Sequence, residues 1–250
     1  MRSNGAPLGR LILLTAAVTP VHPFTGVLKD PAVRLKQYHT ALGFWADIAN
    51  RIDADVLVVE TTGASSVALL SPLSQTQRRK VAVFGHSPSM PATRKGIGAI
   101  EADAIDQVML SLDGRRLVTK ITGRLLVRNA TNLVMSYDGG AFVARRTLDR
   151  KYVDSRLFQV PSALWTARLA GLGQNVDESA GRYLEHVLAQ RLIIGEYDAM
   201  LEVRPFPRRP LIEGASATTG RPYDGVFRRR LNLPLSWVER GVSALASKQI

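Results

Sequence analysis

The sequence predicts a single α/β domain with a mostly parallel central sheet flanked by helices. An unbroken apolar run at residues 11–18 has the composition of an inner parallel strand that is covered on both faces. Strand-like and helix-like runs then alternate through the first half of the chain. A length of 250 residues can supply one sizeable core, and no repeat or linker divides it.

The elements can be placed in order along the chain. After the first strand, Tyr38, Leu42, Trp45 and Ala49 follow helical spacing within residues 31–50. The further strands are expected over 56–59, 80–84, 115–126, 141–144, 152–158 and 199–203. The further helices are expected over 98–112, 162–169, 179–192 and 235–248. Residues 205–225 are rich in Pro, Gly, Ser and Thr, which predicts a loop.

Composition limits the chemistry and the partners. The 33 Lys and Arg residues against 21 Asp and Glu give a net charge of +12, which attracts phosphates, nucleic acid or anionic lipid headgroups. The absence of cysteine excludes disulfides, zinc–thiolate sites, iron–sulfur clusters and thiol nucleophiles. The run at 11–18 is too short to span a membrane, and residues 19–23 make a poor signal-peptide cleavage site. We therefore expect a soluble, cytoplasmic protein.

The strand expected over 115–126 carries the most informative polar residues. Lys120, Thr122 and Arg124 alternate, so they would share one face of that strand. Two cations on an inner strand require anions, and Gly123 permits a close approach of the backbone to a ligand. A diphosphate would satisfy this arrangement, because Arg binds phosphate bidentately and Lys acts as a point charge. The same spacing also fits an edge strand with a solvated charged face.

Other segments could contact an anion as well. In the loop Lys95-Gly96-Ile97-Gly98, two glycines precede a helix whose N-terminus would attract phosphate, although a simple helix start fits the pattern too. Residues 213–221, which include Thr219, form either a loop that wraps phosphate oxygens or a flexible surface loop. The basic runs at 78–80 and 228–230 fit solvated charge, and the second, near Trp237, would also suit an anionic membrane surface.

Two acidic residues are candidates for a general base that takes a proton from a hydroxyl group. Glu185, followed by His186, lies in a predicted helix, and Asp154 precedes Arg156 in a predicted strand. Either carboxylate could instead belong to a solvated surface.

No well-placed metal site is predicted. Asp53-Ala54-Asp55 is a literal D-x-D, but it precedes the strand at 56–59, whereas metal-binding D-x-D pairs follow a strand. It is interpreted as a turn between a helix and a strand. The histidines have no paired ligand spacing; they are His22, His39, His86 and His186.

Several stretches together resemble a group of bacterial glycosyltransferases with a Rossmann-like GT-A-type fold, found in polysaccharide biosynthesis clusters. The matching pieces, spread over about residues 10–220, are 11–18, Glu60-Thr61-Thr62-Gly63, 95–98 with the acidic helix after it, 120–124 and 183–186. The Lys-x-Thr-Gly-Arg piece is the most specific. The resemblance implies a nucleotide-sugar donor, with Lys120 and Arg124 where metal-dependent relatives place their D-x-D. One departure is that Ala99 stands where an acidic residue is expected and Glu101 comes later.

The resulting hypothesis is a metal-independent glycosyltransferase without a cofactor, which moves a sugar from a nucleotide-sugar donor to a glycan, lipid-linked or protein acceptor. Residues 10–126 would bind the donor, residues 127–225 would bind the acceptor and hold the base, and residues 226–250 would form a basic tail. A peripheral contact with the inner face of the membrane is a further expectation. The alternative is a nucleic-acid-binding or non-catalytic interaction protein with a transferase-like fold. Aromatic residues are only 6% of the chain and do not alternate with the basic runs, so nucleic acid is not the expected partner.

Overall fold

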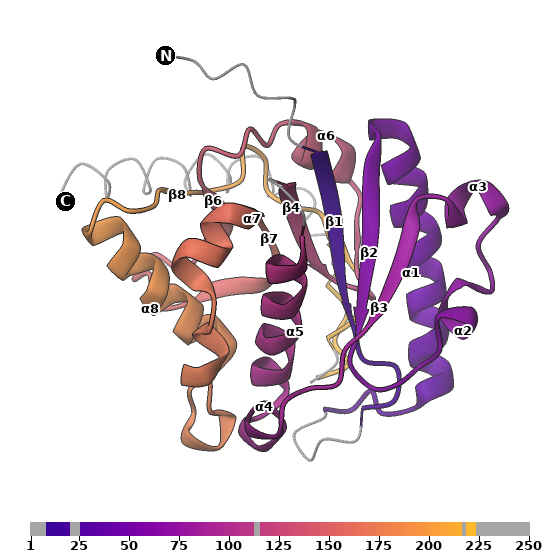
Figure 1. Cartoon of the computed structure of the whole chain (residues 1–250), viewed down its shortest axis with the longest axis horizontal. Helices are drawn as coiled ribbons and strands as arrows, with labels where there is room; N and C mark the ends of the chain where they lie inside the picture. The colour runs from indigo at the N-terminus through magenta and orange to yellow at the C-terminus, as the bar shows by residue number, and fades with distance from the viewer. Residues whose placement is uncertain (1–8, 21–25, 113–115, 217–218, 224–250) are drawn as a thin grey trace.

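Seven strands form the central sheet in the order β3-β2-β1-β4-β7-β6-β8 (Figure 1). The computed structural model describes residues 9–20, 26–112, 116–216 and 219–223. The parallel strands are β1 Gly9–Ala16, β2 Ala54–Glu60, β3 Val81–Gly85 and β4 Arg116–Thr122. The remaining strands are β7 Val153–Pro161, antiparallel to β4, then β6 Phe142–Arg146 and β8 Val203–Arg204. The predicted mostly parallel sheet is confirmed.

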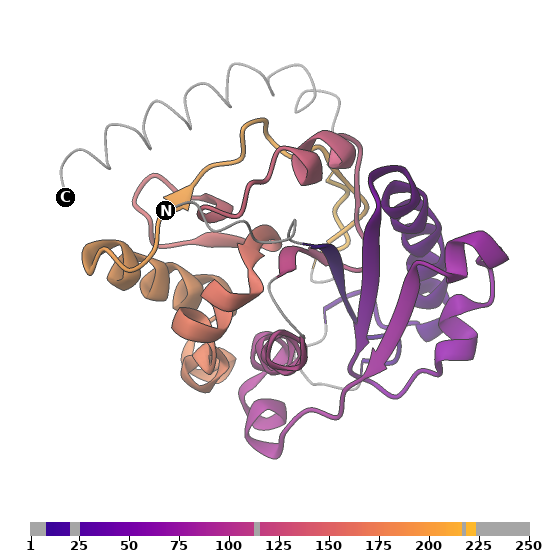
Figure 2. The same cartoon turned by 45° about the horizontal axis from the view of Figure 1, so that its top comes forward.

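Helices cover both faces of this sheet (Figure 2). One face packs against α1 Pro31–Ile52 and α6 Ala130–Met135. The other packs against α5 Ile97–Ser111 and α8 Leu184–Tyr197. The shorter helical elements are α2 Ser66–Leu70, α3 Gln75–Arg78, α4 Met90–Lys95, α7 Ser162–Leu164, a π-helical turn Trp165–Leu169 and the 3₁₀ turns Leu172–Asn175 and Glu178–Ala180. A separate two-stranded ladder joins β5 Leu126–Val127 to β9 Ile212–Glu213.

Helix α1 has clear start and stop signals. The Asp30 side chain accepts hydrogen bonds from the backbone N–H groups of Ala32 and Val33, and Pro31 occupies the first helical position. The helix ends at Asp53, which adopts a left-handed conformation with φ of 50°. These caps set the bounds of the helix, and its buried apolar residues pack against the sheet.

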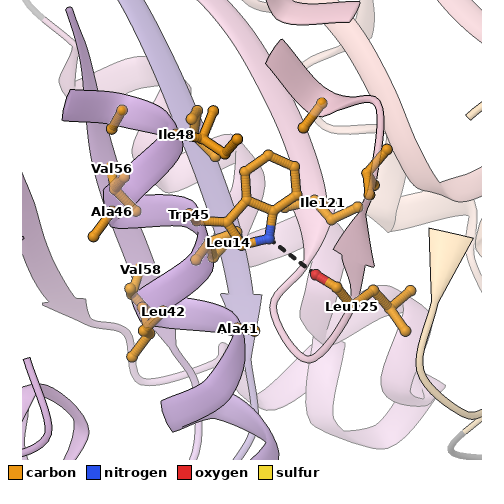
Figure 3. Packing of buried hydrophobic residues seen from close by; sticks show 14 of the residues in the cluster. Leu14, Ala41, Leu42, Trp45, Ala46, Ile48, Val56, Val58, Ile121 and Leu125 are labelled. Atoms are coloured by element: carbon orange, nitrogen blue, oxygen red, sulfur yellow. Dashed lines mark hydrogen bonds between the residues drawn. The ribbon is translucent and has the colours of Figure 1, made fainter. Parts of the chain in front are cut away.

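Trp45 connects α1 to the turn that follows β4. It is 1% exposed, and its ring lies near Leu14 and Ile121 in the same apolar cluster (Figure 3). Its indole Nε1 donates a 2.9 Å hydrogen bond to the carbonyl of Leu125. Because a buried indole N–H needs an acceptor, this bond fixes the chain directly after Arg124.

Several predicted element boundaries require correction. The strand expected over 115–126 ends at Thr122, because the backbone turns there and Leu125 N donates to the Thr122 carbonyl. The helix expected from residue 179 begins at Leu184, since Gly181 adopts a left-handed φ of 71° and ends the preceding 3₁₀ turn. The helix expected over 162–169 is a short α-helical turn followed by a π-helical turn. The helix expected over 235–248 lies outside the described residues.

No helix among residues 9–20, 26–112, 116–216 and 219–223 combines the length and the apolar character needed to cross a bilayer.

Candidate functional site

The carboxyl ends of β1, β2 and β4 meet at one edge of the sheet. In Figure 1, β1 and β2 run downward, so this edge lies toward the bottom of the view. The first residues of β7 join it, because β7 runs antiparallel to β4. In open α/β sheets, ligands bind outside this edge. The polar side chains along this edge are therefore the candidates for ligand binding.

Glu60, at the end of β2, is fully buried and organises the loops after β1 and β2. Its carboxylate accepts hydrogen bonds from the backbone N–H groups of Val18, Thr62 and Ala64 at 2.9–3.1 Å and from the Thr62 hydroxyl at 2.5 Å. Thr61 adds two bonds, from its N–H and its hydroxyl, to the Ala16 carbonyl. All partners of Glu60 are donors, which suits a carboxylate. Glu60 and Thr61 therefore position the loops, and none of these bonds requires a ligand.

Replacing Glu60 by Gln is expected to lower the free energy of unfolding by about 2–3 kcal/mol, because the new amide group turns donors toward backbone N–H groups. Urea denaturation would measure the change. Glu202→Gln is the matched control, since the Glu202 side chain is 57% exposed and is expected to tolerate the substitution. Equal effects at the two positions would contradict a special role for the bonds to Glu60.

Lys120 is fully buried and has an internal anion. Its Nζ donates to Oε1 of Glu101 at 2.6 Å and to the Ser155 carbonyl at 2.6 Å. The same Glu101 oxygen accepts from the Thr15 hydroxyl at 2.7 Å. The expected need of Lys120 for an external anion is therefore met by Glu101 of α5. Glu101, whose role the sequence left open, is thus the counter-ion of Lys120.

Ser155 continues this chain of hydrogen bonds to α8. Its hydroxyl donates to Oε1 of Glu185 at 2.7 Å. The pairing of β6 with β7 shifts here, because Ala144 pairs with Phe158 whereas Arg146 pairs with Val153. Irregular strand segments of this kind redirect side chains and are common beside active sites. The network Thr15–Glu101–Lys120–Ser155–Glu185 thus places two carboxylates at the carboxyl edge, held by one buried lysine.

Arg124 lies on the opposite side of the sheet from Lys120, so the prediction that the two share a face is wrong. Its Nη1 donates to the Ala215 carbonyl at 3.1 Å and to the Gln37 side chain at 3.3 Å. The cause is the turn after Thr122, which ends the strand alternation. Gly123 donates to the Thr15 carbonyl at 2.9 Å, and a Cβ there would lie 2.8 Å from that oxygen. Gly123 is thus required by contact with β1, and no ligand need be invoked for it.

Arg34 of α1 accompanies Arg124, and it was not among the residues predicted from the sequence. Its guanidinium donates to the carbonyls of Ala17 and Leu28 at 2.6 and 3.2 Å and to the Tyr38 hydroxyl at 3.3 Å. Tyr38 OH in turn accepts from Ala17 N at 2.8 Å. A usable signal existed, because a charged residue one helical turn before a core tyrosine is unusual on an apolar helix face.

Arg34 and Arg124 form a pair of buried cations with neutral partners. Their exposed fractions are 6% and 8%, and within the part of the chain that the structure describes neither contacts a carboxylate. Burial lowers the pKa of Arg124. The nearby Tyr38 raises it, and the like charge of Arg34 lowers it further. A guanidinium nevertheless remains protonated in proteins. Buried positive charge without a counter-charge is costly, so this arrangement favours an anionic ligand.

Asp154 and Arg156, at the start of β7, form a tight ion pair. Two guanidinium nitrogens of Arg156 donate to the two Asp154 oxygens at 2.7 and 2.6 Å. Arg145 approaches the same carboxylate at 3.6 Å. Although burial opposes the charged form, the bonds to Asp154 raise the pKa of Arg156. The Arg156 guanidinium also lies 4.4 Å from the ring centroid of Tyr223, which connects β7 to the segment that carries Ala215.

Aromatic rings surround the start of α8. His186 makes edge contacts with Tyr152 and Tyr183, at centroid distances of 5.9 and 5.8 Å. Burial, together with the charges of Glu185 and Asp154, raises the pKa of Tyr152 to about 12. Tyr152 therefore lies within electrostatic reach of both candidate bases.

The predicted anion loop before α5 is occupied by an internal carboxylate. Glu178 accepts from the backbone N–H groups of Ile97 and Gly98 at 3.1 and 2.7 Å. Gly96 has a φ of 125°, and a Cβ there would lie 2.5 Å from the Glu178 carboxylate. Lys95 donates to the Gln174 carbonyl. These residues join the 172–182 segment to α5, so this helix start has no free anion site.

Two predicted segments remain, the turn at Thr219 and the D-x-D. Thr219 is in an exposed turn, where its N–H donates to Ser216 Oγ at 3.2 Å. The D-x-D residues lie at the amino end of β2, where Asp53 pairs with Lys80 and Asp55 with Arg116. The interpretation of the D-x-D as a turn between a helix and a strand is confirmed. A metal ion at the carboxyl edge would not contact it.

Comparison with solved structures identifies the fold. The galactosyltransferase LgtC, in complex with donor and acceptor sugar analogues, aligns with a TM-score of 0.51 at 9% identity over 73% of this chain and 70% of that one. An active-site mutant of LgtC gives 0.49 at 9% identity, covering 78% and 72%. A putative nucleotide-diphospho-sugar transferase from Desulfovibrio desulfuricans G20 gives 0.45 at 11%, covering 79% of each chain. No protein-family model and no curated protein sequence matches the chain. The expected GT-A-type fold is confirmed by this likeness, which at such identity concerns the fold alone.

Proposed function

We propose that this protein transfers a sugar from a nucleoside diphosphate sugar to an acceptor hydroxyl, without a tightly held metal ion. The observation that carries the proposal is the pair Arg34 and Arg124, buried at the carboxyl ends of β1 and β4 with no described carboxylate beside either. In this fold that edge is the natural position for a ligand.

The arginine pair has the chemistry to bind a diphosphate. A guanidinium matches phosphate oxygens with two parallel donors, and such charge-assisted bonds are stronger than neutral ones. Nη1 of Arg124 donates to the Gln37 side chain and the Ala215 carbonyl, and the Tyr38 hydroxyl also interacts with the guanidinium, so all of these partners are neutral. In this proposal the two arginines neutralise the charge on the leaving diphosphate, which a metal ion does in other transferases. Lys120, on the other side of the sheet, instead fixes Glu101 and Ser155.

The transfer step needs a base for the acceptor hydroxyl. The acceptor oxygen forms a bond to the anomeric carbon, the bond from that carbon to the diphosphate breaks, and the hydroxyl proton goes to the base. Glu185 is the better candidate, because only one of its oxygens has a partner among the described residues, the Ser155 hydroxyl. Both oxygens of Asp154 already accept hydrogen bonds from Arg156, so that carboxylate is less available to an acceptor hydroxyl.

Arg124→Gln is expected to weaken the binding of the preferred nucleoside diphosphate by about 10- to 100-fold, because one or two charge-assisted bonds are lost. Thermal shift against UDP, GDP, CDP, dTDP and ADP, with and without chelator, would find the nucleotide, since a ligand that binds the folded state raises its Tm. Isothermal titration would then give the Kd of each variant.

Arg116→Gln is the matched control, because Arg116 lies on the same strand at the opposite edge of the sheet, paired with Asp55. It should retain the Kd of the parent protein. If no nucleotide raises the Tm of the parent protein, the proposed donor class is wrong. Salt-dependent binding of generic DNA or RNA in its place would favour a nucleic-acid-binding protein.

A further inference from the structure

An exposed aromatic cluster lies beside the candidate base. Tyr152 and Tyr183 are 40% and 47% exposed, and the exposed His186 ring lies between them at interplanar angles of 76° and 67°. Tyr183 and His186 are three residues apart at the start of α8, so they lie on one side of the helix. Large exposed rings that gather at one place on a surface commonly mark a binding site.

Glu185 lies close to this aromatic cluster, since its charge acts on Tyr152. It is between Tyr183 and His186 in sequence, and the hydroxyl of Ser155 fixes one of its carboxylate oxygens. Tyr152 directly precedes β7, the strand that carries Ser155. The three rings and the carboxylate therefore come from two elements that the hydrogen bond between Ser155 and Glu185 joins.

The chemistry of this combination matches a sugar. A pyranose ring has an apolar face of C–H groups, which packs against aromatic rings, and an edge of hydroxyl groups, which donate to carboxylates. An extended acyl chain would instead need a continuous apolar groove. The carboxylates of Glu185 and Asp154 lie close to Tyr152, so this surface is too polar for such a chain.

We infer that Tyr152, Tyr183 and His186 form the acceptor subsite and that the acceptor is a sugar whose ring lies on these aromatic side chains. This inference rests on the proposed transferase function. The acceptor sugar lies against the rings while one of its hydroxyl groups donates to Glu185, which orients that oxygen toward the donor.

The test uses Tyr183→Ala, with Tyr197→Ala as the control. Tyr197 is on the same helix and is 79% exposed, but it lies fourteen residues further on, or about 20 Å along the helix axis. Both substitutions remove one exposed tyrosine ring, so the folded state should tolerate both. Saturation-transfer difference NMR would measure the binding of methyl glycosides of glucose, galactose, mannose and N-acetylglucosamine, in the presence of UDP.

The parent protein and Tyr197→Ala are expected to bind at least one of these glycosides, and Tyr183→Ala is expected to bind it about tenfold more weakly. If the parent protein binds none of them, or if the two variants bind equally well, the inference is overturned. Nucleotide binding, measured by thermal shift on the same samples, separates the two proposals. A Tm shift without glycoside binding overturns only the acceptor inference, whereas no shift with any nucleotide overturns the proposed donor.

Discussion

Replacing Glu185 by Gln is expected to lower kcat by about 10²- to 10⁴-fold, the range that a positioned general base contributes. The amide can still accept the hydrogen bond from Ser155, so the network to Lys120 should persist. It cannot take up the acceptor proton at neutral pH. Donor affinity and Tm should change little. Single-turnover transfer from the identified donor would isolate the chemical step from product release.

Two further variants make this result specific. Glu196→Gln changes the same residue type near the other end of α8, where Glu196 pairs with Arg146, and should leave kcat unchanged. Asp154→Asn removes the other candidate base and breaks the pair with Arg156. A large loss of kcat for Asp154→Asn with normal turnover for Glu185→Gln would assign the base to Asp154.

The sheet was predictable because its signals are local. The run at 11–18 and the helical spacing of Tyr38, Leu42 and Trp45 depend on near neighbours, and the structure has β1 and α1 at these positions. In open sheets of this kind, ligands bind outside the carboxyl ends of the strands. Glu60 ends β2 and Arg124 follows β4, so both residues lie at that edge of the sheet.

The partners of the polar residues could not be predicted, because they come from distant parts of the sequence. Spacing indicated correctly that Lys120 needs an anion, but it could not show that Glu101 would supply it from α5. The N–H groups at the start of α5 suggested a phosphate, yet Glu178, about eighty residues away, accepts their hydrogen bonds. In both cases the chain satisfies its own polar groups, as buried polar groups generally require.

The faces of the residues after β4 were misassigned for a physical reason. Strand alternation holds only while the strand continues, and the close contact between Gly123 and β1 ends it two residues before Arg124. The glycine could have been interpreted as a turn signal rather than as space for a ligand. This error also concealed Arg34, because only the observed turn brings Arg124 to the α1 side of the sheet.

The ion pair between Lys120 and Glu101 is expected to be essential for stability, and the two partners should contribute unequally. Glu101→Gln leaves the fully buried Lys120 charge without its counter-charge, which should lower the free energy of unfolding by about 3–5 kcal/mol. Lys120→Met removes the buried charge and leaves Glu101, whose side chain is 21% exposed and can reach water. Its cost should therefore be smaller. Urea denaturation of both variants would measure these differences.

The double variant Lys120→Met/Glu101→Gln tests whether the pair itself causes these effects. It should lose less stability than the sum of the single losses, because no buried charge is left without a partner. Lys80→Met is the exposed counterpart, since Lys80 pairs with Asp53, whose side chain is 95% exposed, and no measurable loss is expected. Strict additivity in the double variant would show that Lys120 and Glu101 act independently. Non-additive stability losses would show that the two residues are coupled. If the double variant also transfers the sugar more slowly, the pair positions Ser155 and Glu185 for catalysis as well.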